Sequence, residues 1–114
     1  HRLPRQIPLK LAMGLLLTGK NITAQEAHRV GLVNEVVPLA ELMPTAESWA
    51  EEILKGAPLS APAIKQMAMS GLAWPLDVAI SRDYSEHDKA KASDDWTEGP
   101  RAFAEKRKPQ WQRR

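Results

Sequence analysis

The residues best suited to chemistry lie near the C-terminus, where Phe103, the only phenylalanine, precedes Lys106 and Arg107. Positions three and four apart share a face of a helix, so this spacing predicts an aromatic ring beside two cations. Such a group suits a nucleotide, because the ring can stack on a base while an ammonium pairs with phosphate. The alternative is that Phe103 anchors a core beside solvated basic neighbours, and on chemistry alone that arrangement is the commoner one.

The rest of the chain offers few groups for catalysis. There is no cysteine, which excludes thiolate nucleophiles, disulfides and cysteine-type zinc sites. The histidines stand apart in the sequence: His1, His28 and His87. Glu51-Glu52 and Asp94-Asp95 are adjacent pairs, and neighbours on a helix point in different directions, so neither pair forms an acid/base couple. We therefore expect no catalytic residue and no metal site in this chain.

Basic charge is concentrated at one end. Residues 97–114 carry six Lys/Arg against two Asp/Glu, whereas residues 1–96 carry ten against twelve. A basic tail can bind anions such as nucleic acid or a phosphorylated cofactor, or it can simply be solvated. The four tryptophans are scattered and form no stacking pattern, which weakens the nucleic-acid hypothesis.

The elements that must position these residues are helices. Apolar residues recur at helical spacing, with glycine and proline at the breaks. No apolar stretch reaches the roughly 20 residues that a membrane helix needs. The pattern predicts an all-α chain of about six helices, over residues 8–18, 23–30, 44–54, 60–72, 75–87 and 98–107. Residues 32–38 form an extended connector or, at most, one very short strand near 33–37.

Three local features of this pattern make specific predictions. Thr23 and Glu26 have the spacing of a capping box, in which Thr23 accepts from the Glu26 amide and Glu26 reaches back to the Thr23 amide. The segment 75–87 places Leu76 through His87 along one helical face. The first helix is apolar on nearly all sides, so it is expected to pack against structure that this chain does not contain.

Three segments together resemble the enoyl-CoA hydratase/isomerase (crotonase) superfamily. The first carries R-L-P-R, A-M and L-T-G at residues 2–19, and the second carries I-T-A-Q-E-A and G-L-V-N-E-V-V-P at residues 22–38. The third is E-G-P-R-A-F-A-E-K-R-K-P at residues 98–109. The resemblance covers the whole chain in order, and the motifs are stronger together than singly.

The resemblance implies that residues 1–114 are the C-terminal helical region of a crotonase-fold protein. The N-terminal spiral core, with the oxyanion hole and acid/base carboxylates, would lie upstream, so the chain alone is expected to be inactive. In the family, the aromatic residue and the lysine of the last motif approach the adenine and phosphate of CoA. This carries over to Phe103 and Lys106, while Arg107 is a weaker candidate.

The resemblance also implies the parent reaction, which is addition of water to a 2-enoyl-CoA thioester, with CoA as substrate carrier and no covalently bound cofactor. Isomerases, dehalogenases, decarboxylases and hydrolases share this tail and stay open as alternatives. The expected partners are an acyl-CoA, the N-terminal part of the same protein and further copies in a homotrimer or hexamer. Neither nucleic acid nor a membrane is expected, and the expected location is the cytoplasm. The hypothesis from another class is a non-catalytic helical module with an anion-binding tail.

Overall fold

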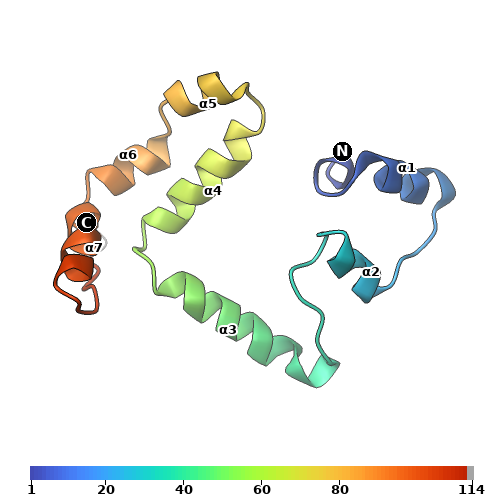
Figure 1. Cartoon of the computed structure of the whole chain (residues 1–114), viewed down its shortest axis with the longest axis horizontal. Coiled ribbons are helices and arrows are strands. Elements are labelled where there is room, and N and C mark those ends of the chain that lie inside the picture. The colour runs from blue at the N-terminus through green and yellow to red at the C-terminus, as the bar shows by residue number, and fades with distance from the viewer. Residues whose placement is uncertain (113–114) are drawn as a thin grey trace. The chain divides into compact units, whose positions relative to one another are not determined.

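The computed structural model describes residues 1–112, so Arg113 and Arg114 of the basic tail lie outside the described residues. Within residues 1–112 the chain forms seven α-helices and two short 3-10 helices, η1 (Leu3–Arg5) and η2 (Leu39–Glu41), and no strand (Figure 1). The prediction of an all-α chain is confirmed, and residues 32–38 form a connector without a strand, bent over residues 32–34. The chain divides into two units, residues 1–45 and 46–114.

The first unit contains α1 (Leu9–Thr18) and α2 (Ala24–Arg29). Helix α1 ends at Gly19 as predicted, and α2 begins at Thr23, whose hydroxyl accepts from the Glu26 amide at 3.1 Å. The second half of the predicted capping box is wrong. Both oxygens of the Glu26 carboxylate accept from Arg29 instead, at 2.8 and 2.5 Å.

Helix α3 (Leu42–Leu54) runs across the division, with Pro44 in its first turn, where a missing N–H is tolerated. The second unit continues through α4 (Ser60–Gly71), α5 (Leu76–Ser81), α6 (Ser85–Lys91) and α7 (Asp95–Ala104). Helix α5 reverses the chain, so that α6 packs against α4 and then leads into α7 (Figure 1).

The helix predicted over 75–87 is wrong, because the chain breaks between α5 and α6. Arg82 and Tyr84 are both extended, so Leu76 and His87 do not share one helical face. Two contacts hold the break. The buried Tyr84 donates its hydroxyl proton to the Ala79 carbonyl at 3.0 Å, and the side-chain oxygen of Gln66 on α4 accepts from the Glu86 amide at 2.9 Å.

Large apolar side chains are exposed in both units. On α1, Leu16 is 56% exposed and Leu17 is 77% exposed, while Ala12 is the buried residue of that helix. In the second unit, Ile64 and Leu72 on and after α4 are 66% and 81% exposed. Among the described residues no large side chain is fully buried. These helices therefore present apolar faces that the residues described leave uncovered.

Candidate functional site

Helix α7 carries the third family-like segment, but its bounds differ from the prediction. It begins at Asp95 and ends at Ala104, three residues earlier at each end than the predicted helix over 98–107. Pro100 consequently lies inside the helix instead of in its first turn. Because proline has no N–H, Pro100 cannot donate to the carbonyl of Trp96. The two acidic residues before Thr97 stand at the helix N-terminus, as their charge favours.

The end of α7 is a Schellman turn. The Lys106 amide donates to the Phe103 carbonyl at 3.2 Å, and the Arg107 amide donates to the Ala102 carbonyl at 3.0 Å. This geometry requires a left-handed backbone at the residue whose amide makes the first of these bonds, and Lys106 has a φ of +54°. Glycine is the usual residue at such a position, and a residue with a Cβ costs roughly 1 kcal/mol more there. Lys106 is the only non-glycine residue in the described chain with a positive φ.

The prediction that Phe103, Lys106 and Arg107 share a helical face is therefore wrong. The helix has ended before Lys106, and the left-handed turn sends the chain back along α7. Within the described residues Phe103 anchors no core, because it is 87% exposed. Phe103 and Lys106 remain close in the chain, both exposed, on either side of the helix end.

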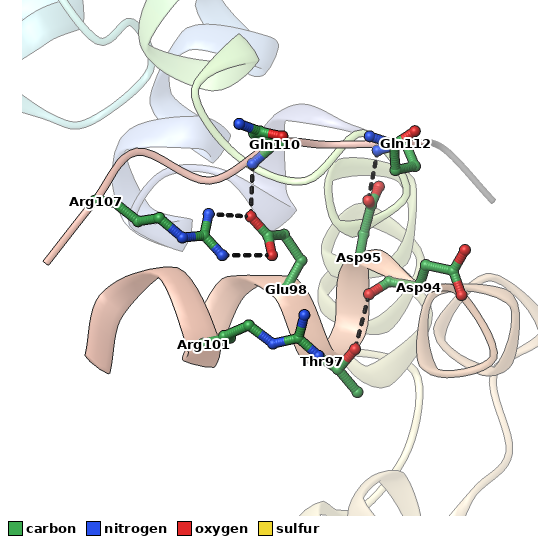
Figure 2. A pocket seen from close by; sticks show the side chains of 8 residues that line it. All are labelled: Asp94, Asp95, Thr97, Glu98, Arg101, Arg107, Gln110 and Gln112. Atoms are coloured by element: carbon green, nitrogen blue, oxygen red, sulfur yellow. Dashed lines mark hydrogen bonds and ion pairs between the residues drawn. The ribbon is translucent and has the colours of Figure 1, made fainter. Parts of the chain in front are cut away.

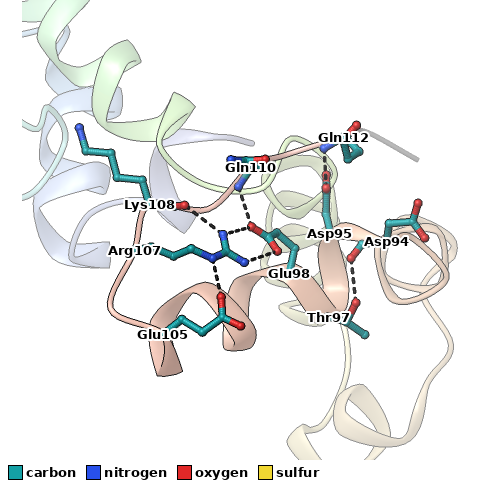
Figure 3. A network of polar contacts seen from close by, with 9 residues as sticks. All are labelled: Asp94, Asp95, Thr97, Glu98, Glu105, Arg107, Lys108, Gln110 and Gln112. Atoms are coloured by element: carbon teal, nitrogen blue, oxygen red, sulfur yellow. Dashed lines mark hydrogen bonds and ion pairs between the residues drawn. The ribbon is translucent and has the colours of Figure 1, made fainter.

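Arg107 is paired, unlike its neighbour Lys106. Its Nη1 and Nη2 donate to the two oxygens of Glu98 at 2.5 and 2.9 Å, and its Nε donates to Glu105 at 2.6 Å (Figure 3). These hydrogen bonds raise the pKa of Arg107 above its ordinary value. The hydrogen bonds from Arg107, and then the one from the Gln110 amide, lower the pKa of Glu98 to about 2. Arg107 is thus a structural cation and not an unpaired surface charge.

The segment after Lys106 lies along α7 and is held at several points. The Gln110 amide donates to Glu98 at 2.8 Å, and the Gln112 amide donates to the buried Asp95 at 2.6 Å. Between them, the Trp111 indole donates to the Lys55 carbonyl at 3.0 Å. A Cβ placed on Gly99 would lie 3.4 Å from the Trp111 ring, so the indole packs against α7 at this position.

The hollow of about 540 Å³ beneath this segment is lined by polar side chains (Figure 2). Its lining is formed by residues of α7 and of the returning segment: Asp94, Asp95, Thr97, Glu98, Arg101, Arg107, Gln110 and Gln112. Much of the lining is already engaged, since Glu98 pairs with Arg107 and Asp95 accepts from Gln112. Neither Phe103 nor Lys106 lines it. The hollow therefore belongs to the hydrogen-bonded segment that returns along α7, and the exposed Phe103 and Lys106 lie outside it.

The Glu98–Arg107 pair is what sequence reasoning missed. The two residues are nine positions apart, a separation that no helical periodicity brings together. The signal lay in the predicted helix end: a helix closing before Lys106 lets the following residue fold back toward the preceding turn. A helix predicted to continue through Arg107 does not allow this contact.

The remaining chemistry-bearing residues do not gather into a further site in the described part of the chain. His87 on α6 meets Trp96 edge-on, with ring centroids 5.7 Å apart. Within residues 1–112 no three His, Asp or Glu side chains are grouped as a metal site would require. No helix there has the length and apolar character needed to cross a membrane.

The all-helical order and the motif built around α7 define a class, namely the helical region of crotonase-fold proteins. The chain belongs to the enoyl-CoA hydratase/isomerase family, whose model matches residues 1–114. It is 44% identical over 113 residues to enoyl-CoA hydratase EchA19 of Mycobacterium tuberculosis, covering 99% of this chain and 42% of that protein. It is 44% identical over 107 residues to (E)-benzylidenesuccinyl-CoA hydratase of Thauera aromatica, covering 94% of this chain and 42% of that protein.

Solved structures agree with the sequence comparison. A crystal structure from Novosphingobium aromaticivorans, assigned as a short chain enoyl-CoA hydratase, superposes with a TM-score of 0.94 at 43% identity. It covers 100% of this chain and 45% of that one. Enoyl-CoA hydratase from Bacillus anthracis superposes with a TM-score of 0.90 at 33% identity, covering 100% of this chain and 44% of that one. The chain thus spans less than half the length of these relatives.

Proposed function

We propose that this chain is the C-terminal CoA-contacting and trimerisation region of an enzyme that adds water to 2-enoyl-CoA thioesters. The observation that carries the CoA contact is the pair of exposed side chains at the end of α7. Phe103 is 87% exposed, and the exposed Lys106 makes no ion pair within residues 1–112. An exposed ring can stack on adenine, and an ammonium can pair with phosphate.

The reaction is proposed from the family and from the relatives, several of which are named as CoA hydratases. The acid/base carboxylates and oxyanion hole would come from residues preceding this chain in the complete protein, and no residue here is proposed as catalytic. Isomerisation, dehalogenation, decarboxylation and thioester hydrolysis stay open as parent reactions. The substrate would be a CoA thioester, with no covalently bound cofactor.

The trimerisation role is supported by the uncovered apolar faces of the second unit. An apolar groove of about 550 Å³ lies along α4, α5 and α6, and its lining includes Met67, Leu72, Trp74 and Ile80. Large exposed apolar patches are typical of surfaces that bind other protein chains or domains. We propose that the N-terminal part of the protein and neighbouring copies cover these faces.

The pairing of Arg107 favours this function over the nucleic-acid module. All three nitrogens of its guanidinium donate within the chain, to Glu98, Glu105 and the Lys108 carbonyl. One cation of the basic tail is therefore committed to structure, which leaves a smaller surface for phosphate backbones.

Kinetics on the full-length protein test the CoA contact. Lys106→Ala and Phe103→Ala should each raise the KM for crotonyl-CoA about three- to tenfold with little change in kcat, because contacts remote from the reacting atoms contribute uniform binding. Crotonyl-pantetheine lacks the nucleotide and should be unaffected. Unchanged KM for crotonyl-CoA in both variants would remove the turn from the CoA site. Sedimentation should give the mass of a trimer or hexamer, and a monomer would contradict the assembly role.

A further inference from the structure

We propose that Glu98 and Arg107 are positioning residues, whose ion pair closes the end of α7 into the turn that presents Phe103 and Lys106. The inference rests on the proposed function, since it gives this turn the same CoA ligand. It assigns to Glu98 and Arg107 a role that differs from that of Lys106, which lies between them in the sequence.

The first observation is that four of the five N–H groups of the Arg107 guanidinium are already used within the chain. Its three guanidinium nitrogens reach two carboxylates and one backbone carbonyl. Binding a phosphate would require Arg107 to give up the bidentate contact with Glu98. Arg107 therefore acts on a ligand through the backbone that it holds, and Lys106 is the cation of the turn that is available to an anion.

The second observation is the backbone of Lys106. A residue with a side chain is rarely left-handed unless its surroundings impose that conformation. Here the turn is held on its C-terminal side by three hydrogen bonds to the Glu98 carboxylate, two from the Arg107 side chain and one from the Gln110 amide (Figure 3). Glu98 lies on α7 itself and its side chain is only 14% exposed, so the tie joins the turn to the helix body.

The consequence for recognition is that the exposed ring and the ammonium are held on a defined backbone before a ligand arrives. Preorganisation raises affinity because less freedom is lost on binding. Without the Glu98–Arg107 pair, the left-handed residue relaxes, the turn samples other conformations and Lys106 loses its fixed position relative to Phe103.

The test is carried out on the full-length protein with crotonyl-CoA, crotonyl-pantetheine and adenosine 3′,5′-bisphosphate as ligands. Arg107→Ala and Glu98→Gln should each raise the KM for crotonyl-CoA and the Kd for the bisphosphate about threefold or more. The kcat and the KM for crotonyl-pantetheine should stay within about twofold. Arg107→Lys, which keeps the charge but loses the fork, should fall between Arg107→Ala and the parent.

A double variant separates positioning from direct contact. If Arg107 acts through Lys106, Arg107→Ala should add less than about twofold to KM when Lys106 is already alanine. Arg29→Ala is the matched control, because Arg29 makes a similar bidentate pair with Glu26 in the other unit. It should leave the KM for crotonyl-CoA and the Kd for the bisphosphate unchanged.

Each other outcome overturns the proposal in a recognisable way. If Lys106→Ala and Phe103→Ala weaken CoA binding but Arg107→Ala and Glu98→Gln do not, positioning is wrong and the CoA contact stands. Fully multiplicative effects of Lys106→Ala and Arg107→Ala would make Arg107 an independent ligand. Equal losses with crotonyl-CoA and crotonyl-pantetheine would mean general damage, and if Arg107→Ala fails to fold, Arg107→Lys and Glu98→Gln give the same comparison. If neither Lys106→Ala nor Phe103→Ala weakens CoA binding, both proposals are overturned.

Discussion

Helices α2 and α7 end in the same turn but reach it by different means. After α2, the Gly31 amide donates to His28 at 3.0 Å and the Leu32 amide donates to Ala27 at 2.8 Å. After α7, the corresponding bonds are made by Lys106 and Arg107. The left-handed residue is Gly31 in the first case, with a φ of +78°, and Lys106 in the second, with a φ of +54°.

Each helix end also has a bidentate Glu–Arg pair, placed differently with respect to the turn. Glu26 and Arg29 are three residues apart and both lie in α2. Glu98 and Arg107 are on opposite sides of the turn, and the Glu98 side chain is 14% exposed against 35% for Glu26. The first pair joins residues of one helix, whereas the second joins a helix to the chain that leaves it.

The comparison indicates what a left-handed residue requires. Glycine adopts a positive φ without a Cβ clash, so Gly31 needs no brace across its turn. Lys106 is disfavoured there, and the bonds to Glu98 from both Arg107 and Gln110 hold its turn closed. A side chain at this position suits a binding surface, which glycine could not provide.

Placing lysine in the unbraced turn should give the largest effect. Gly31→Lys introduces a Cβ at a φ of +78° with no tie across the turn, and should weaken the α2 end by roughly 1–2 kcal/mol. Native-state hydrogen exchange of the Leu32 amide in the full-length protein should be about tenfold faster. Unchanged exchange would mean that the unbraced turn tolerates lysine and that no brace is needed at Lys106.

The reverse substitution should have a smaller effect of opposite sign. Lys106→Gly removes the Cβ from the left-handed position and should slow exchange of the Arg107 amide, by about 0.5–1 kcal/mol of added local stability. The same variant should bind CoA more weakly, because the ammonium is gone. A gain in stability with a loss of binding is the result that a merely structural lysine would not give. Lys106→Asn is the matched control, since asparagine tolerates this conformation without a charge.

The two helix ends also mark how far the sequence could predict the fold. The start of α2 at Thr23 and the end of α1 at Gly19 depend on local chemistry, and both were predicted. The end of α7 was not, because its left-handed residue is a lysine that local rules place in the helix. Its conformation depends on Glu98, nine residues from Arg107, and on Gln110.

The break between α5 and α6 was not predicted, for the same reason. Apolar spacing continues through Tyr84, so a local pattern predicts one helix. The break is held by the bond from the Glu86 amide to Gln66, twenty residues away on α4. For the site, the motif resemblance indicated Phe103 and Lys106, but it gave no geometry, and the shared helical face drawn for them was wrong.

An effect of intermediate size is expected for the pKa of Glu98. Arg107 and the Gln110 amide hold the pKa of Glu98 at about 2, below its ordinary value of 4.5. A lowered pKa in the folded state means that the unfolded state binds more protons between these values, so the contribution of the pair is full above pH 4.5 and is lost as pH falls through about 2. Carboxyl NMR titration of the full-length protein should show this value, and Arg107→Ala should raise it toward 4.5. A Glu98 pKa that Arg107→Ala does not change would contradict the pairing.

The smallest effect is expected for the Glu26–Arg29 pair, which lies within α2 and does not span the turn at its end. Arg29 lowers the pKa of Glu26 through its hydrogen bonds, yet its side chain is 70% exposed and the pair lies within one helix. Solvent and salt screen such pairs, so Arg29→Ala should leave the melting temperature within measurement error. The Leu32 amide should exchange as in the parent, whereas Arg107→Ala should speed exchange of the residue 107 amide. If the two arginine variants loosened their turns equally, the distinction between a pair within a helix and a pair across its end would have no energetic basis, and Lys106 would need another explanation for its left-handed backbone.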